Sequence, residues 1–94
     1  MAYLFLNNIF QFTCMSAPLD NIDKKLREAI GKRLKEIREK SGKTQETVAH
    51  ELGRDKQSYN KNETGKGTTI YIVHKFCQEN NITLKYFFDS PLFK

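Results

Sequence analysis

Residues 44–65 read TQETVAHELGRDKQSYNKNETG and carry the capping signals of two short helices. Thr44 and Asp55 are residue types whose side-chain oxygens cap helix N-termini. Gly53 and Gly65 suit the left-handed backbone conformation that ends a helix. These four residues predict two consecutive helices that are joined by a tight turn.

The two predicted helices differ in polarity. The helix over 45–52 has apolar side chains on one face, and its small Ala49 lets a second helix cross closely. The helix over 55–64 is polar almost throughout. Because core packing explains so polar a helix poorly, the pattern favours a surface that contacts a polar partner. Together the two segments predict a helix-turn-helix.

Three further helices, and no strand, are predicted between residues 20 and 90. Apolar residues at spacings of four, four and three indicate one amphipathic helix over 21–40, capped by Asp20 or Asn21. They are Leu26, Ile30, Leu34 and Ile37. The caps of a fourth and a fifth helix are expected at Thr68 or Thr69 and at Thr83. The residues available for burial in these two helices are Ile70, Ile72, Val73, Phe76, Cys77, Leu84, Phe87 and Phe88.

The predicted fold class is therefore all-α, a compact domain of five helices with the helix-turn-helix at helices 2 and 3. The domain is expected over 20–90, after an apolar N-terminal arm or extension at 1–19 and before a C-terminal tail at 91–94. The longest apolar run of the arm, Met1–Leu6, is too short to span a membrane, and no basic segment of a signal peptide precedes it. Three interpretations of the arm stay open. It packs on the domain or a second subunit, it is a disordered extension, or translation starts at Met15.

Composition limits the classes of function. A net charge of +5, with nine bases against three acids over 24–43, suits a polyanionic partner. Cys14 and Cys77 are too few for a disulfide framework, which favours a reducing, cytoplasmic compartment. His50 and His74 have no partner at metal-ligand spacing, and no nucleophile lies beside a credible base. The chain is therefore expected to have no metal site, no cofactor and no enzymatic activity.

Many residues between Ile30 and Phe88 have separate mechanical roles and fall in one register. They are Gly31, Lys32, Arg33, Leu34, Ile37, Arg38, Gly42, Thr44, Gln45, Val48, Ala49, Leu52, Gly53, Ser58, Glu63, Gly65 and Lys66. With this combination, about two thirds of the chain resembles the lambda-repressor-like (Cro/C1-type, XRE) helix-turn-helix family. The resemblance implies that the helix over 55–64 enters the DNA major groove, while the helix that starts at Gln45 bridges the backbone.

The resemblance also implies candidate site residues. Base-reading side chains are expected at Lys56, Gln57, Ser58 and Lys61, since lysine reaches guanine O6 and N7 and glutamine pairs with adenine N6 and N7. Phosphate contacts are expected at Thr44, Gln45, Asn60 and Lys66. Arg38 and Glu63 lie at positions where members of the family often hold a partly buried ion pair.

The chain departs from the family pattern at three positions that are usually apolar: Arg54 in the turn, and Tyr59 and Asn62 on the inner face of the recognition helix. Arg54 can extend its charge to solvent, and Tyr59 can bury its ring. An amide in an apolar contact costs roughly 1–3 kcal/mol unless it is hydrogen-bonded. Asn62 therefore requires a partner, a tilted third helix or relaxed selection for DNA binding.

The resulting hypothesis is a sequence-specific regulator of transcription, repressor-like, that binds double-stranded DNA as a homodimer. The alternative is a protein-interaction or antitoxin-like module whose DNA binding is secondary or lost. In the homodimer, the recognition helices are expected roughly 34 Å apart. The 3–12 arm is expected beside the interface, where it can pair as a strand. The interface is expected to use apolar residues that a core of under about 100 residues cannot readily absorb, namely Tyr86, Phe87, Phe88, Leu92 and Phe93.

Overall fold

A computed structural model describes the backbone of residues 2–94 and the side chains of residues 21–94. Over these residues the chain is all-helical, without a strand, which confirms the predicted fold class. The elements are α1 (Ala2–Lys40), α2 (Gln45–Glu51), α3 (Lys56–Glu63), α4 (Ile70–Glu79), α5 (Leu84–Phe88) and the 3₁₀ helix η1 (Pro91–Phe93).

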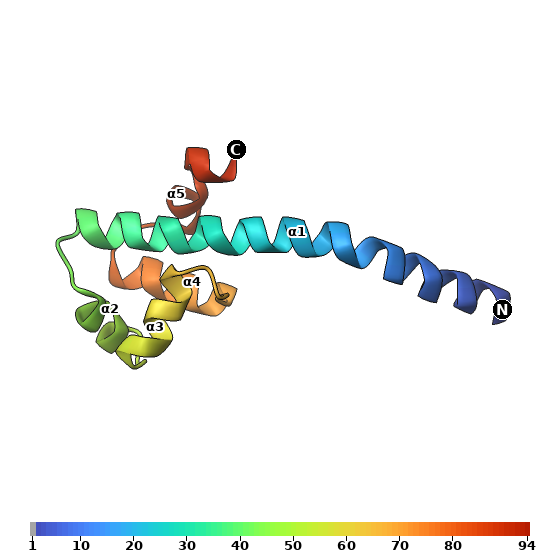
Figure 1. Cartoon of the computed structure of the whole chain (residues 1–94). Helices are drawn as coiled ribbons and strands as arrows, with labels where there is room; N and C mark the ends of the chain where they lie inside the picture. The colour runs from blue at the N-terminus through green and yellow to red at the C-terminus, as the bar shows by residue number, and fades with distance from the viewer. Residues whose placement is uncertain (1) are drawn as a thin grey trace.

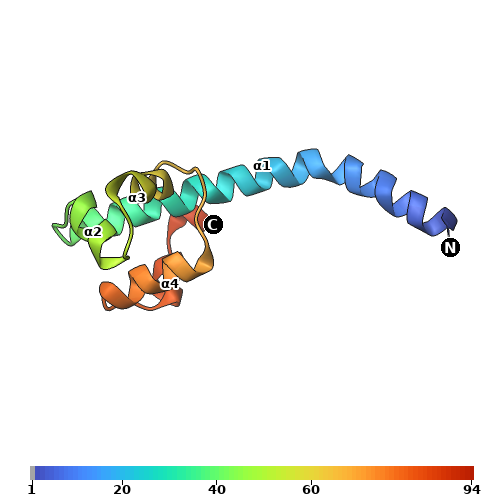
Figure 2. The same ribbon diagram turned by 90° about the horizontal axis from the view of Figure 1, so that it is seen from below.

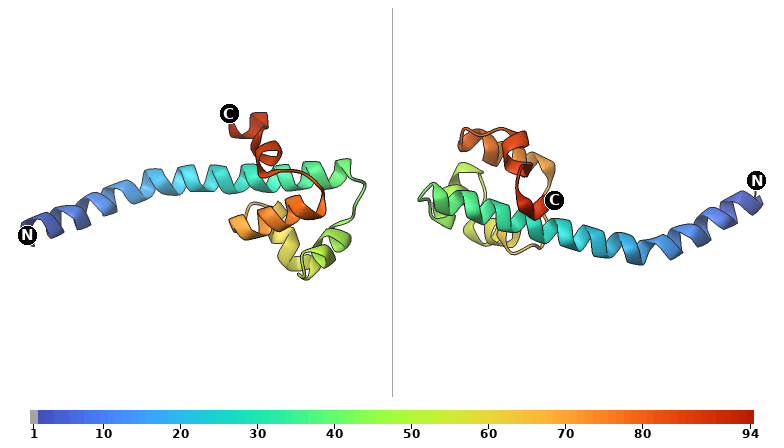
Figure 3. Two further views of the ribbon diagram at one scale, coloured as in Figure 1. Left: turned by 180° about the vertical axis from the view of Figure 1, so that it is seen from behind. Right: turned by 90° about the horizontal axis from the view of Figure 1, so that it is seen from above.

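The long helix α1 is the axis of the fold. Helices α2, α3 and α4 lie on one side of its C-terminal half, whereas α5 and the C-terminus lie on the other side (Figure 1). The N-terminal half of α1 extends beyond the other helices, as the views in Figures 2 and 3 also show. The three helices that carry the helix-turn-helix and its support are therefore on one side of a single rod.

Each of the helices α2 to α5 begins at a predicted N-cap residue. The side-chain oxygen of each cap accepts the backbone N–H of the residue three positions later, which satisfies one of the free donors of the helix start. The four caps are Thr44, Asp55, Thr69 and Thr83. The turn after α2 uses Gly53 at φ +69°, where a side chain would be strained.

Helix α1 begins much earlier than predicted. The expected start at Asp20 or Asn21 is wrong, because α1 runs without interruption from Ala2. The expected strand pairing of the 3–12 arm is wrong for the same reason. Residues 2–19 contain no glycine that would end a helix, and α1 continues through Pro18, so the cap-type residues at 20 and 21 lie inside the helix. Within the described chain, no helix combines the length and the apolar character that a bilayer span requires.

The core lies where α1 meets the other helices. Its buried members are Leu34, Ile37, Val48, Ala49, Leu52, Tyr59, Val73, Phe76, Cys77 and Phe87. Two side chains that were expected to be buried are exposed, Leu26 by 47% and Ile70 by 54%. Leu26 lies one turn before Ile30, where the packing of α1 on the core begins, and Ile70 is the first residue of α4.

Arg33 of α1 attaches the C-terminal segment. Its side chain is buried, and its Nε and Nη2 donate to the carbonyls of Phe87 (2.7 Å) and Tyr86 (2.8 Å) at the end of α5. Phe87 packs edge-on against Phe76 and Phe88, with ring centroids 6.2 and 4.9 Å apart. The cation thereby binds the C-terminal carbonyls of α5, of which that of Tyr86 also accepts the backbone N–H of Asp89.

Much of the C-terminal aromatic cluster is absorbed by the chain's own core, contrary to the expectation from its size. Phe87 is fully buried, while Phe88 and Phe93 are half-buried and pack against the core. The rings of Phe88 and Phe93 are 5.0 Å apart. Tyr86 and Leu92 stay exposed, by 48% and 39%.

Helices α1 and α3 approach each other most closely at Gly31. A Cβ atom at this position would lie 2.5 Å from the carbonyl oxygen of Glu63 and 2.9 Å from that of Asn62. Only a residue without a side chain allows the backbone of α3 to come so near, so Gly31 sets the position of α3 against α1.

Candidate nucleic-acid interface

The helix-turn-helix is built from α2, the turn at residues 52–55, and α3. The backbone N–H of Arg54 donates to the carbonyl of Ala49 at 2.8 Å, which closes the turn. Ala49 is 2% exposed, consistent with close crossing of the two helices. The side chain of Arg54 is half-buried. The backbone geometry therefore matches the predicted motif.

Three buried side chains hold the inner face of α3. Tyr59 is fully buried, as expected for its ring, and burial raises the pKa of its hydroxyl. Asn62 has the partner that its position requires, because its Nδ2 donates to the carbonyl of Gly67 at 2.8 Å. Glu63 is the third. Asn62 thus gains one hydrogen bond on the inner face of α3, whereas its Oδ1 and the hydroxyl of Tyr59 are buried without a hydrogen-bond partner among the described residues.

Glu63 forms an ion pair with Arg38 of α1. Nε of Arg38 donates to Oε2 of Glu63 at 2.6 Å, and Nη2 donates to Oε1 at 3.2 Å. The side chains are 12% and 2% exposed respectively. Burial alone would raise the pKa of the Glu63 carboxyl, but the hydrogen bonds from Arg38 and Gln45 lower it. The hydrogen bond to Glu63 raises the pKa of Arg38.

The outer face of α3 carries exposed polar and basic side chains. Lys56, Gln57, Asn60 and Lys61 are all exposed, and with Gln45 of α2 they line one open groove of about 500 Å³. The structure therefore brings together three of the four predicted base-reading residues and two of the predicted phosphate contacts. Because these residues come from both helices, the groove spans the helix-turn-helix.

The remaining predicted site residues do not line this groove. The hydroxyl and backbone N–H of Ser58 donate to the Asp55 carboxylate, which lowers the pKa of Asp55. Thr44 accepts the backbone N–H of Thr47 as the cap of α2. Lys66 is exposed in the loop after α3. Among the residues whose side chains are described, none forms an ion pair with the ammonium group of Lys66.

Sequence reasoning did not identify Lys43 at this surface. Lys43 lines a second groove of about 500 Å³ together with Arg38, Thr44, Gln45, Glu46 and Lys56. Its carbonyl accepts a hydrogen bond from Arg38 at 3.0 Å, and its Nζ lies 3.0 Å from the Glu51 carboxylate. The available signal was its position, since a lysine directly before an N-cap lies at the positive end of the following helix.

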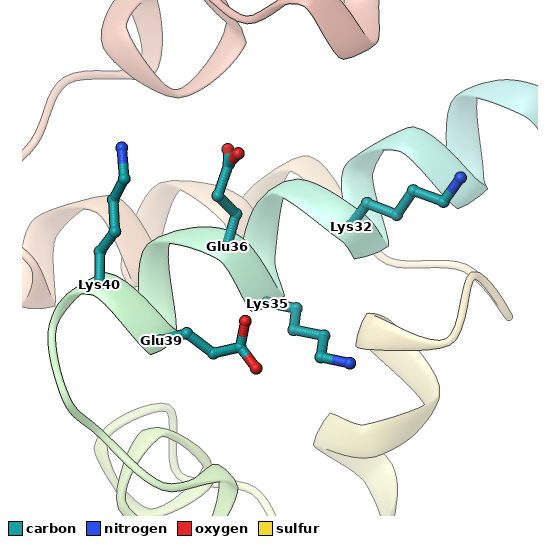
Figure 4. Close-up of a pocket in the computed structure, with 5 residues that line it drawn as sticks. All are labelled: Lys32, Lys35, Glu36, Glu39 and Lys40. Atoms are coloured by element: carbon teal, nitrogen blue, oxygen red, sulfur yellow. The ribbon is translucent and has the colours of Figure 1, made fainter.

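A further depression lies along α1 and shares no lining residue with the two grooves of the helix-turn-helix. It is lined by Lys32, Lys35, Glu36, Glu39 and Lys40. Figure 4 shows Glu36 and Lys40 on one side of the helix and Lys35 and Glu39 on another. Charges of both signs at such spacings are typical of a solvated helix face. Within the part of the chain whose side chains are described, no cluster of His, Cys, Asp and Glu has the arrangement of a metal site.

Comparisons with known proteins agree with this geometry. No curated protein and no solved structure shows significant similarity to the chain. A family model described as "Helix-turn-helix domain" matches residues 29–78, from the first core-facing turns of α1 to the last turn of α4. This match covers more than half of the chain and is consistent with the lambda-repressor-like resemblance. The chain therefore belongs to the helix-turn-helix domain family.

Proposed function

We propose that this protein binds double-stranded DNA at specific sequences and regulates transcription in the manner of a repressor. The observation that carries the proposal is the division of α3 into two faces. Tyr59, Asn62 and Glu63 fix the helix to the core, whereas its exposed face consists of lysine, glutamine and asparagine side chains. Apart from Asn60, which accepts a hydrogen bond from Gln45, these outer side chains make no hydrogen bond or ion pair over the described part of the chain, and they suit the edges of bases in a major groove.

The proposed roles follow from chemistry and position. Lys56 and Lys61 donate to guanine O6 and N7, and Gln57 pairs with adenine. Ser58 contributes through the lone pairs of its hydroxyl, because its proton is directed to Asp55. Phosphates are contacted at the start of α2, at Thr44 and Gln45, and from α3 and the following loop, at Asn60 and Lys66.

The proposed active species is a homodimer in the cytoplasm, associated with the nucleoid. One recognition helix contacts few base pairs, so a two-fold pair of helices roughly 34 Å apart is needed to select a site. The exposed apolar side chains at the C-terminus and on α1 support an interface on the side of α1 that carries α5. They are Tyr86, Leu92, Ile22 and Leu26.

Selection from random-sequence DNA tests the proposed specificity. The wild-type protein is expected to enrich a consensus, and the triple variant with Lys56, Gln57 and Lys61 changed to alanine is expected to enrich none. The matched control changes Lys24, Gln78 and Lys85 to alanine. These residues are exposed, and their replacement removes the same two positive charges and one side-chain amide as the triple variant. If the control loses the consensus as completely as the triple variant, net charge rather than the α3 face is responsible.

Sedimentation of the full chain and of a chain that starts at Met15 tests the dimer. A monomer in both at micromolar concentration contradicts the homodimer, and a dimer in both shows that the arm is dispensable.

The same exposed apolar side chains favour a second candidate function, a protein-interaction or antitoxin-like module. In that case a partner protein covers Tyr86, Leu92, Ile22 and Leu26, and DNA binding is secondary. The triple variant of the α3 face distinguishes the two candidates. It abolishes the activity of a DNA-binding regulator, but leaves the binding of a protein partner intact.

A further inference from the structure

A chain of hydrogen bonds leads from the buried ion pair to the proposed DNA-binding face. Arg38 donates to Glu63, and Oε1 of Glu63 accepts a hydrogen bond from Nε2 of Gln45 at 3.0 Å. The same Nε2 donates to Oδ1 of Asn60, also at 3.0 Å. Gln45 is half-buried between the two acceptors, whereas Asn60 is exposed on the outer face of α3. Four side chains from three helices are therefore joined in one network.

The orientation of every amide in this network follows from one group. An ionised carboxylate only accepts hydrogen bonds, so the atom of Gln45 that faces Glu63 must be the nitrogen. That nitrogen carries two protons, and both are used, one by Glu63 and one by Asn60. The atom of Asn60 that faces a donor must in turn be its oxygen. As a result, Oε1 of Gln45 and Nδ2 of Asn60 are the atoms left free.

We propose that Glu63 is a positioning residue that sets the polarity of the DNA-binding surface, so that Asn60 presents a donor and Gln45 presents an acceptor. This inference rests on the proposed DNA binding. Nδ2 of Asn60 supplies N–H groups for phosphate oxygens or for guanine O6 and N7. The side chain of Gln45 has no free donor for a phosphate, so its phosphate contact comes from its backbone N–H at the start of α2.

Reversing Gln45 would place two acceptors face to face inside the network, and reversing Asn60 would place two donors face to face. A rotated Gln45 would direct Oε1 at the Glu63 carboxylate, and a rotated Asn60 would direct Nδ2 at the nitrogen of Gln45. Each arrangement loses a hydrogen bond and adds repulsion, at a half-buried site for Gln45 and at an exposed site for Asn60. The surface is therefore held in one polarity before DNA arrives, which avoids the cost of ordering Asn60 on binding.

A double-mutant cycle between Gln45 and Asn60 tests this inference without disturbing the ion pair. Gln45→Met keeps the length of the side chain and removes its amide, so Asn60 is free to rotate. It is expected to weaken binding to a duplex that the wild-type protein selects from random-sequence DNA by roughly three- to tenfold. Asn60→Ala is expected to weaken binding by a similar factor, and the double variant no further than Asn60→Ala alone.

Matched controls and a second measurement distinguish the outcomes. Gln78→Met and Asn21→Ala, both exposed and outside the network, are expected to leave affinity unchanged. If the losses of Gln45→Met and Asn60→Ala multiply, the side chain of Gln45 contacts DNA itself and the inference is overturned.

In NMR spectra, DNA is expected to shift the side-chain amide signals of Asn60 and to leave those of Gln45 in place. A shift of the Gln45 signals alone contradicts the proposed polarity.

The variant Glu63→Gln provides an independent test, once thermal melting has shown that it is folded. A glutamine can face Gln45 with either end of its amide, so the polarity is no longer fixed. We expect the side-chain amide protons of Gln45 to exchange slowly in the free wild-type protein and faster in Glu63→Gln. If that exchange is already fast in the wild type, the network does not hold Gln45 and the inference fails. If the wild-type protein has no affinity for any duplex, the proposed function fails, while the exchange measurement still reports on the network.

Discussion

Replacing Gly31 with alanine tests the contact that positions α3 against α1. In most helix interiors this change stabilises a protein by about 1 kcal/mol, because alanine has the higher helix propensity. Here the new Cβ would lie 2.5 Å from the backbone oxygen of Glu63, whereas ordinary contact begins at 3.4 Å. The end of α3 must therefore retreat by about 0.9 Å. Backbone atoms cannot turn aside as a flexible side chain does.

The expected loss follows from two terms. Overpacking of this kind costs typically about 1–3 kcal/mol. Displacing Glu63 also weakens its charged hydrogen bonds to Arg38, which contribute about 1.5–3 kcal/mol each when intact. After the gain in helix propensity is subtracted from these two terms, we expect the free energy of unfolding to fall by about 3 kcal/mol. For a domain of this size, that loss lowers the melting temperature by more than about 10 °C.

Thermal and urea unfolding followed by circular dichroism measure this loss. Lys32→Ala is the matched control, because Lys32 is exposed on the next position of the same helix and should change stability by less than about 0.5 kcal/mol. If Gly31→Ala is as stable as the wild type, or more stable as propensity alone predicts, the close approach of α1 and α3 is not a constraint on the fold.

Three further predictions concern single side chains. Glu63→Ala is expected to cost about 3–5 kcal/mol, because it strands the Arg38 charge, while Glu79→Ala at an exposed site changes little; equal melting temperatures contradict this. Because the pKa of Glu63 is lowered in the folded state, the contribution of its carboxylate to the free energy of unfolding is complete above its ordinary pKa of 4.5 and is lost as the pH falls through the folded-state pKa. The difference in stability between the wild type and Glu63→Ala should therefore shrink on acidification, as unfolding at decreasing pH would show. Arg33→Met should release the end of α5, seen as faster amide exchange there than in the other helices; uniform exchange argues against the attachment. Gln57→Ala should weaken the preferred DNA site by roughly 1–3 kcal/mol and blur one base position, whereas Lys66→Ala should weaken all sequences alike and reduce the salt dependence; an equal effect of Gln57→Ala on random DNA contradicts its role in base reading.

The parts of the fold that sequence could predict are those that local chemistry determines. The N-caps Thr44, Asp55, Thr69 and Thr83 each bond a backbone group three residues away, so a short window of sequence contains all of the interaction. The start of α1 was not predicted, because the cap-type residues at 20 and 21 lie in a longer segment that continues the helix on their N-terminal side.

The parts that sequence could not predict depend on contacts between distant segments. Arg33 looks like one more base in a basic helix, and its partners Tyr86 and Phe87 lie more than fifty residues away. Asn62 was recognised as a residue that needs a partner, but the carbonyl of Gly67 comes from a loop that has no sequence signature. For the candidate site, the exposed residues of α3 could be placed from helical periodicity. The bonds that tie Gln45 to Asn60 and Glu63 could not, because they require the crossing of α2 and α3.

The separation of α3 into a fixed face and an exposed face has a consequence for protein engineering. Over the described part of the chain, the side chains of Lys56, Gln57 and Lys61 make no hydrogen bond or ion pair with other residues. A combinatorial library randomised at these three codons should therefore consist mostly of folded members, since surface substitutions away from special contacts change stability by less than about 0.5 kcal/mol. One scaffold can then be supplied with many different recognition surfaces, and selection among them acts on target choice rather than on folding.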